Sequence, residues 1–144
     1  MKLATQSDIS ALLDLVQTFY YQAGYPFNRA RSQQALSLLV ASPHLGQAWL
    51  IERDLALVGY AVLTFGFSLE YGGRDAILDE LYIRPEHQRQ GLGTAAIARL
   101  EKVCLEEGIQ ALHLEVERGS RAVQLYKRVG FKAHERDFMT KWLV

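Results

Sequence analysis

Residues 88–94 read Gln-Arg-Gln-Gly-Leu-Gly-Thr, a composition typical of a turn that binds anions. Two glycines two positions apart let the backbone bend so that consecutive N–H groups point in one direction. The positive end of a following helix adds to their attraction for phosphate oxygens. Arg89 would add a mobile positive charge at the rim. The predicted phosphate contacts are Gln88, Arg89, Gln90, Gly91, Leu92, Gly93 and Thr94.

Two adjacent carboxylates, Asp79 and Glu80, interrupt the otherwise apolar run 77–83. Carboxylates in a buried strand are costly unless a partner compensates them. A substrate ammonium or a water relay would do so, and hydrogen bonds to the backbone or to Arg at a strand kink are the alternative. Neighbouring strand residues point to opposite faces, so only one of the two side chains should reach a substrate amine unless a bulge splays the strand.

Aromatic side chains gather in two further places. Residues 20–27 hold four aromatic rings around a glycine and a proline, and two phenylalanines precede Glu70 near the end of a predicted strand. The loop 20–27 has two explanations, as rings that pack on the core or as a lid over a bound acceptor. The strand before Glu70 would border the central cleft. The residues predicted to contact an acceptor are Tyr21, Phe65, Phe67 and Glu70.

Hydrophobic periodicity predicts the elements that position these residues. An amphipathic helix is expected over 9–19, capped by Ser7 or Asp8, and further helices over 29–40, 94–107 and about 122–129. Strands are expected at 3–5, 48–52, 55–67, 77–83 and 112–116, with a turn at Arg53-Asp54 and a bulge near Gly59. The pattern is that of a single α/β domain over residues 1–144.

Composition supports one compact domain and excludes several functions. The 144 residues are 49% hydrophobic, and 16 acidic residues balance 16 basic ones, so neither a nucleic acid nor a membrane surface is an expected partner. The N-terminus lacks the apolar core of a signal peptide, which predicts a cytoplasmic protein. The single cysteine, Cys104, lies on a helical apolar stripe, and no two His are four residues apart, so no metal site is expected.

Two familiar phosphate loops fit poorly. A P-loop would need Lys after its last glycine, but Thr94 follows Gly93. A dinucleotide fingerprint would need a third glycine where this chain has Ala96, although Glu115 and Glu117 lie at about the distance of its acidic residue. The chain leaves no room for a doubly wound sheet after this unit, so the sequence disfavours a dinucleotide-binding module.

The order of the features matches a known family. The run Leu-Asp-Glu-Leu-Tyr-Ile-Arg-Pro at 78–85 precedes the Gln-x-x-Gly-x-Gly turn. A helix, a strand, a second helix with Ala-x-x-Leu-Tyr at 122–126 and Gly-Phe at 130–131 follow. This combination resembles the GNAT superfamily of acyl-CoA-dependent N-acyltransferases, whose corresponding turn binds the coenzyme A pyrophosphate. The resemblance implies a mixed, mostly antiparallel sheet, flanked by helices and splayed where coenzyme A inserts.

The resemblance also implies roles for individual residues. A tyrosine at the place of Tyr126 commonly gives a proton to the departing thiolate. In the similar polyamine acetyltransferases a Glu-Asp pair stands where this chain has Asp79 and Glu80, so these two are the predicted amine-binding and base residues, and which one faces the acceptor stays open. Backbone N–H groups of the strand would stabilise the charge that grows on the thioester oxygen. That strand segment is Leu81, Tyr82 and Ile83.

One position departs from the family pattern. Many members have Asn three residues before the alanine of the second helix, where this chain has Gly119. The change removes one side chain that usually contacts the pantetheine arm. Ser120 is expected to cap this helix instead and is included among the predicted coenzyme contacts.

The function implied is an acetyl-CoA-dependent N-acetyltransferase that uses no metal and acts on a small cationic amine, a polyamine or a lysine side chain. Direct attack by the amine fits the absence of a nucleophile paired with a histidine. The alternative is a non-catalytic acyl-CoA-binding or protein-interaction domain. A homodimer is expected, because similar proteins are often homodimers and the apolar run 138–144 could pair across an interface.

Overall fold

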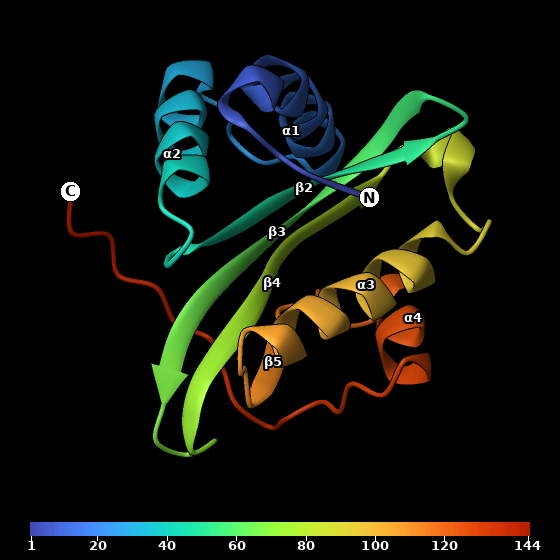
Figure 1. The fold of residues 1–144 in the computed structure, drawn as a ribbon. Coiled ribbons are helices and arrows are strands. Elements are labelled where there is room, and N and C mark those ends of the chain that lie inside the picture. Colours follow the sequence, from blue (N-terminus) through green and yellow to red (C-terminus); the bar gives the residue numbers. More distant parts are fainter.

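A computed structural model describes all 144 residues, which form one open five-stranded sheet with helices on both faces (Figure 1). The strand order is β1-β2-β3-β4-β5, antiparallel except for the parallel pair β4 and β5. This confirms the predicted mixed, mostly antiparallel sheet. The strands are β1 (Lys2–Leu3), β2 (Gly46–Arg53), β3 (Ala56–Ser68), β4 (Gly73–Ile83) and β5 (Ala111–Leu114).

Two pairs of helices cover the sheet. Helices α1 and α2 lie on one face, and α3 and α4 lie on the other (Figure 1). No helix is long and apolar enough to cross a membrane. The helices are α1 (Ile9–Ala23), α2 (Arg29–Ala41), α3 (Leu92–Glu106) and α4 (Ala122–Arg128), with single 3₁₀ turns at Gln6–Asp8 and Pro85–His87.

Each sheet face has its own apolar core. Helix α1 buries Leu12, Leu13 and Val16, a spacing that places them on one side of the helix. On the opposite face, α3 buries the stripe that the sequence predicted, including Cys104 as a structural thiol. Burial raises the pKa of the Cys104 thiol, which opposes a nucleophilic role.

A bulge in β4 changes which face its side chains occupy. Leu78 pairs with Leu63 of β3, but Glu80 pairs with the next residue back, Val62, so Asp79 is an extra residue with no partner of its own. Leu78 packs in the α3 core, whereas Tyr82, an even number of residues later, packs in the α1 core. The bulge therefore turns Glu80 toward α1 and α2 and leaves Asp79 at the kink.

The structure corrects two local predictions. The β2–β3 turn is formed by Asp54 and Leu55, both with positive φ, because a tight hairpin needs two such residues; Leu55 is therefore not in the strand. The β2–β3 register shifts opposite Gly59, near the expected bulge. Strand β5 ends at Leu114, two residues earlier than predicted. Residues 131–144 form no strand with the sheet.

Candidate active site

The parallel pairing of β4 and β5 ends where the bulge begins. Four residues of each strand pair, up to Leu78 and Leu114, and β4 then continues to Ile83 without a strand on that side. One edge of the segment 79–83 is therefore open to a ligand. The split supports the splayed sheet that the family resemblance implied, and the bulge shows why the strands part at this residue.

The turn 88–94 connects this open edge to α3. Gly91, with φ of +80°, precedes the first residue of α3, and no side chain caps the helix. The first turn of α3 holds no acidic residue, so its free N–H groups and the positive helix end face no internal anion. This arrangement suits the phosphates of a ligand, as the composition predicted.

The side chains in the turn have a structural role. Gln88 Nε2 donates to the carbonyl oxygen of Ile83 at 2.8 Å, which ties the turn to the end of β4. Gln90 accepts a hydrogen bond from Arg53 and donates one to the Glu86 carbonyl oxygen. The backbone of this turn is therefore better placed than its glutamines to bind an anion.

The two glycines of the turn are needed for different reasons. A Cβ at Gly91 would meet no atom within 4 Å, but its positive φ disfavours any other residue. A Cβ at Gly93 would lie 3.2 Å from Leu125 Cδ2 of α4, so this glycine allows α4 to approach the start of α3.

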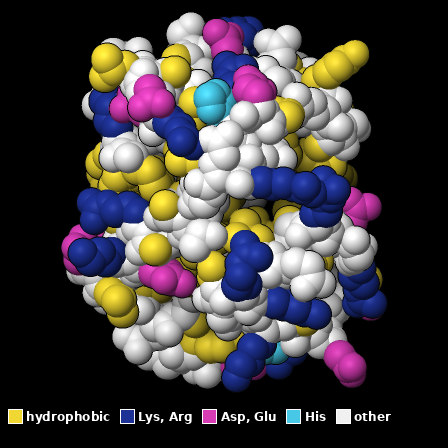
Figure 2. Space-filling model, turned by 90° about the vertical axis from the view of Figure 1, so that its right-hand side faces the viewer, with side chains coloured by type: hydrophobic (Ala, Val, Ile, Leu, Met, Phe, Trp, Pro, Cys, Tyr) yellow, Lys and Arg dark blue, Asp and Glu magenta, His cyan; other side chains and the backbone are white.

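The surface around the turn is positively charged. On the side of the molecule that carries α3 and the β2–β3 hairpin, Lys and Arg side chains border a hollow with hydrophobic residues inside it (Figure 2). Arg53 belongs to this region through its contact with Gln90, and Arg89, with φ of +58°, is exposed in the turn. A hollow of this kind fits a ligand with an anionic end and an apolar arm.

Gly91→Val is expected to raise the Kd for coenzyme A by about tenfold, equivalent to about 1.4 kcal/mol, because the strained turn would misalign its N–H groups. The matched control is Gly108→Val. Gly108 also has a positive φ, +70°, and a Cβ there would meet no atom within 4 Å, but it lies at the other end of α3. Both variants should lose similar thermal stability, but only Gly91→Val should weaken binding in calorimetry. Equal affinities for the two variants would refute a role of the turn in binding.

On the other side of β4, Glu80 is held by two tyrosines. Tyr20 of α1 donates to Glu80 Oε1 at 2.5 Å, and Tyr60 of β3 donates to Oε2 at 2.6 Å. Burial raises the pKa of the Glu80 carboxyl, an effect that these two hydrogen bonds oppose. Glu80 is thus anchored between α1 and the sheet.

Asp79 has a different environment. It lies at the bulge, exposed, and its carboxylate has no hydrogen-bond or ion-pair partner. Partial burial of the carboxyl raises its pKa. Of the two adjacent acids, Asp79 is therefore the one whose carboxylate is not already held by the protein.

Tyr126 lies on α4, and its ring packs edge-to-face on Phe131 with ring centres 5.8 Å apart. Its pKa is raised by burial, so the phenol keeps its proton at neutral pH. Ser120, just before α4, has a buried Oγ with no partner. It does not cap α4 as predicted, because Arg121 stands at the N-cap position and no side chain caps the helix.

The predicted acceptor residues do not form one group. Phe65 is partly buried beside the α3 core, whereas Phe67 is largely exposed. Glu70 lies in the β3–β4 turn and forms an ion pair with Arg136, which donates to both carboxylate oxygens at 2.8 and 2.9 Å. Tyr21 points outward from α1. Their role in acceptor binding stays a prediction.

Sequence reasoning did not find Tyr20 and Tyr60 as partners of Glu80. They lie 60 and 20 residues away along the chain, so no local pattern connects them to that carboxylate. The one usable signal in the sequence is the cluster of aromatic residues that begins at Tyr20.

Comparison with known proteins places this arrangement in a family. The Acetyltransferase (GNAT) family matches residues 9–131, most of the chain. The chain belongs to the GNAT acetyltransferase family. An integron cassette protein from the mobile metagenome of Cole Harbour Salt Marsh has the same GNAT fold with a TM-score of 0.90 and 34% identity, covering 99% of this chain and 90% of that one.

Other relatives of this GNAT protein are more distant or match in part. A predicted acetyltransferase from Clostridium acetobutylicum, solved with acetyl-CoA, has a TM-score of 0.82 at 20% identity over 97% of this chain and 94% of that one, which shows the shared fold. The thialysine N-epsilon-acetyltransferase of Bos taurus is 36% identical over 75 residues. That match covers 51% of this chain and 44% of the relative, so the chain spans less than half the length of the curated relatives it matches.

Proposed function

We propose that this GNAT protein transfers an acetyl group from acetyl-CoA to a primary amine. The observation that carries the proposal is the position of three features around one split in the sheet. These are the open helix N-terminus at Gly91, the unpaired acid Asp79 at the bulge, and Tyr126 on α4, which packs with Leu81 of β4 against the same core.

Several residues would hold the acyl donor. The N–H groups at the start of α3 and the charge of Arg89 suit a pyrophosphate. The open edge of β4 over 81–83 offers backbone groups to an extended arm, and the buried, unpartnered Ser120 Oγ is free to form a hydrogen bond with the ligand. When bound, the donor supplies a thioester whose carbonyl carbon is the group transferred.

The chain must supply a base because most amine molecules are protonated. An alkyl amine with a pKa near 10.4 is neutral in about one molecule in 2,500 at pH 7, which corresponds to about 4.6 kcal/mol. Asp79 would take the proton from the ammonium, directly or through a water. The amine nitrogen then bonds to the acetyl carbon as the carbon–sulfur bond breaks, and it gives its second proton to solvent as the amide forms.

The departing sulfur also needs a proton. Tyr126 would give its phenol proton to that sulfur and so prevent an unstabilised thiolate. Backbone N–H groups within 81–83 would stabilise the negative charge that grows on the carbonyl oxygen. Glu80, fixed by two tyrosine hydroxyls, would hold the acceptor side of the site and add negative charge that attracts an ammonium.

The acceptor we propose is a small cationic amine, a polyamine or a lysine side chain. The thialysine N-epsilon-acetyltransferases that match half of this chain support an amine of this kind. Phe65, Phe67 and Glu70 lie farther along the same β3–β4 hairpin and would contact only the outer part of an acceptor.

We also propose a homodimer. The end of the chain exposes several apolar side chains, and Arg31 of α2 lies over the Trp142 ring at 5.3 Å. A second copy would cover this segment. Light scattering should give about twice the monomer mass, and a monomer at micromolar concentration would refute the dimer. The exposed residues are Phe138, Met139, Trp142, Leu143 and Val144.

Ligand ranking tests this function against the two alternatives. Thermal shifts should be large with acetyl-CoA and coenzyme A and absent with NAD or NADP, since only a binding ligand stabilises the fold. A dinucleotide-binding module would show the reverse order. A non-catalytic acyl-CoA-binding domain would bind acetyl-CoA but release no free thiol when amines are added.

A further inference from the structure

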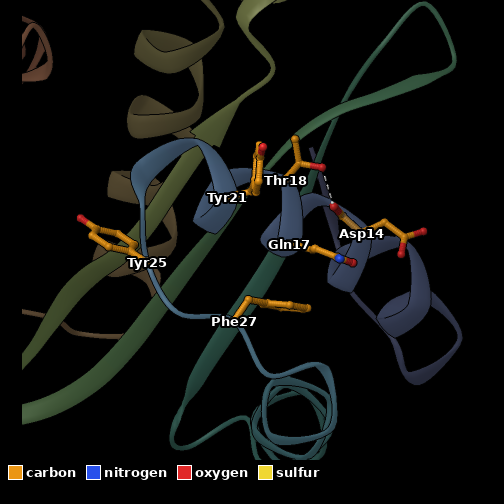
Figure 3. A pocket seen from close by; sticks show the side chains of 6 residues that line it. All are labelled: Asp14, Gln17, Thr18, Tyr21, Tyr25 and Phe27. Carbon is orange, nitrogen blue, oxygen red and sulfur yellow. Dashed lines mark hydrogen bonds between the residues drawn. The ribbon is translucent and has the colours of Figure 1, made fainter.

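A shallow bowl of about 660 Å³ lies outside the split in the sheet, between the second half of α1 and the segment that leads to α2 (Figure 3). Its volume falls within the range of ligand sites and exceeds the needs of a single amine group. It is lined by Asp14, Gln17, Thr18, Tyr21, Tyr25 and Phe27.

The bowl exposes two tyrosine rings. The Tyr21 side chain is 87% exposed and that of Tyr25 is 56% exposed. Among the six residues, the only hydrogen bond made by a side chain joins the Thr18 hydroxyl to the Asp14 carbonyl oxygen (Figure 3), so both phenols are free. Exposed, unpaired tyrosines at the rim of a hollow are typical of a binding surface.

The charge in the bowl is already balanced. Arg29 contacts Asp14 Oδ1 at 2.9 Å and donates to Gln17 Oε1 at 3.3 Å. A second ammonium of a polyamine would therefore face a carboxylate that is already paired with a guanidinium. The Gln17 amide nitrogen and the two phenols instead offer neutral hydrogen bonds, which suit the N–H and C=O groups of a peptide.

A single ring separates the bowl from the anchored acid of the proposed active site. Tyr25 and Phe27 pack edge-on against Tyr20, with ring centres 5.7 and 6.1 Å from it. The Tyr20 hydroxyl in turn donates to Glu80. A ligand that extends past Tyr20 would therefore reach the acceptor side of the sheet with one end and the bowl with the other.

From this geometry we infer that the bowl binds the polypeptide on either side of an acceptor lysine, so that the acceptor is a lysine within a peptide. The inference rests on the proposed amine acetylation and makes it more specific. Tyr21 and Tyr25 are then specificity residues, which contact backbone and side chains of the peptide without touching the reacting atoms.

The test compares kcat/KM for lysine in a seven-residue neutral peptide with kcat/KM for butylamine and for spermidine. The parent protein should prefer the peptide. In Tyr21→Ala the ratio of peptide to butylamine should fall by about tenfold through a higher KM for the peptide. The control Leu105→Ala removes an exposed apolar side chain from α3 and should leave the ratio unchanged. A preference for spermidine, or an unchanged ratio in Tyr21→Ala, would refute the inference.

Direct binding separates this inference from the proposed function. The same peptide with norleucine in place of lysine has no amine to acetylate, yet it should bind in calorimetry, and Tyr21→Ala should weaken that binding by about tenfold. Binding with this pattern but no acetylation of any amine would support the bowl and refute the enzyme activity. Acetylation of amines without detectable peptide binding would support the activity and refute the bowl.

Discussion

Asp79→Asn is expected to lower kcat/KM for a primary amine at pH 7 by about 10³-fold, within the range that general acid–base catalysis contributes. Asp79 is the extra residue of the β4 bulge, and its carboxylate has no partner in the protein. An amide of the same shape cannot accept the proton of an ammonium. Steady-state kinetics with saturating acetyl-CoA would measure the loss.

The pH profile of this variant provides a second readout. Burial raises the pKa of the Asp79 carboxyl, so the parent should lose activity as the pH falls through a value above the ordinary range of an aspartate. In Asp79→Asn that limb should disappear. Activity should then recover in part toward pH 10, where more of the amine is already neutral.

Glu80→Gln serves as the matched control, because it makes the same chemical change one residue away. An amide oxygen at this position can still accept a hydrogen bond from Tyr20 or Tyr60. We expect a loss of about tenfold, or about 1.4 kcal/mol, mainly as a higher KM for the amine. Losses of the same size with the same pH profile in both variants would contradict the separate roles of these two acids.

Tyr126→Phe is expected to lower kcat by about 10²-fold and to change the affinity for coenzyme A by no more than a few-fold. The hydroxyl is the only group removed, and the ring can keep its edge-to-face contact with Phe131. A lower kcat with unchanged melting temperature would show loss of the proton donor. If kcat stays at the parent value, Tyr126 is a packing residue and the sulfur obtains its proton elsewhere.

Local features of the site were predictable from the sequence. The turn 88–94 was recognisable because its glycines, its exposed Arg89 and the helix that follows lie within a few residues of one another. The stripe on α3 followed from simple helical periodicity. The mixed sheet was implied by the family resemblance, and the helix between β4 and β5 is what allows these two strands to run parallel.

Features that depend on contacts between distant segments were not predictable. Simple alternation placed Asp79 and Glu80 on opposite faces, but the bulge that sets their directions is a register shift against β3. The pairing of Glu70 with Arg136, 66 residues away along the chain, has no local signal in the sequence. Ser120 looked like a helix cap by residue type, yet the path of the chain through Arg121 leaves its hydroxyl without a partner.

Release of free thiol from acetyl-CoA tests the central claim most directly. The protein is mixed with acetyl-CoA labelled with ¹³C in the acetyl group, with and without a panel of primary amines and lysine-containing peptides. We predict thiol release that depends on the amine, with an equal amount of label in an N-acetyl product detected by mass spectrometry. Tight binding of acetyl-CoA with no amine-dependent thiol release and no labelled product from any amine in the panel would contradict the account.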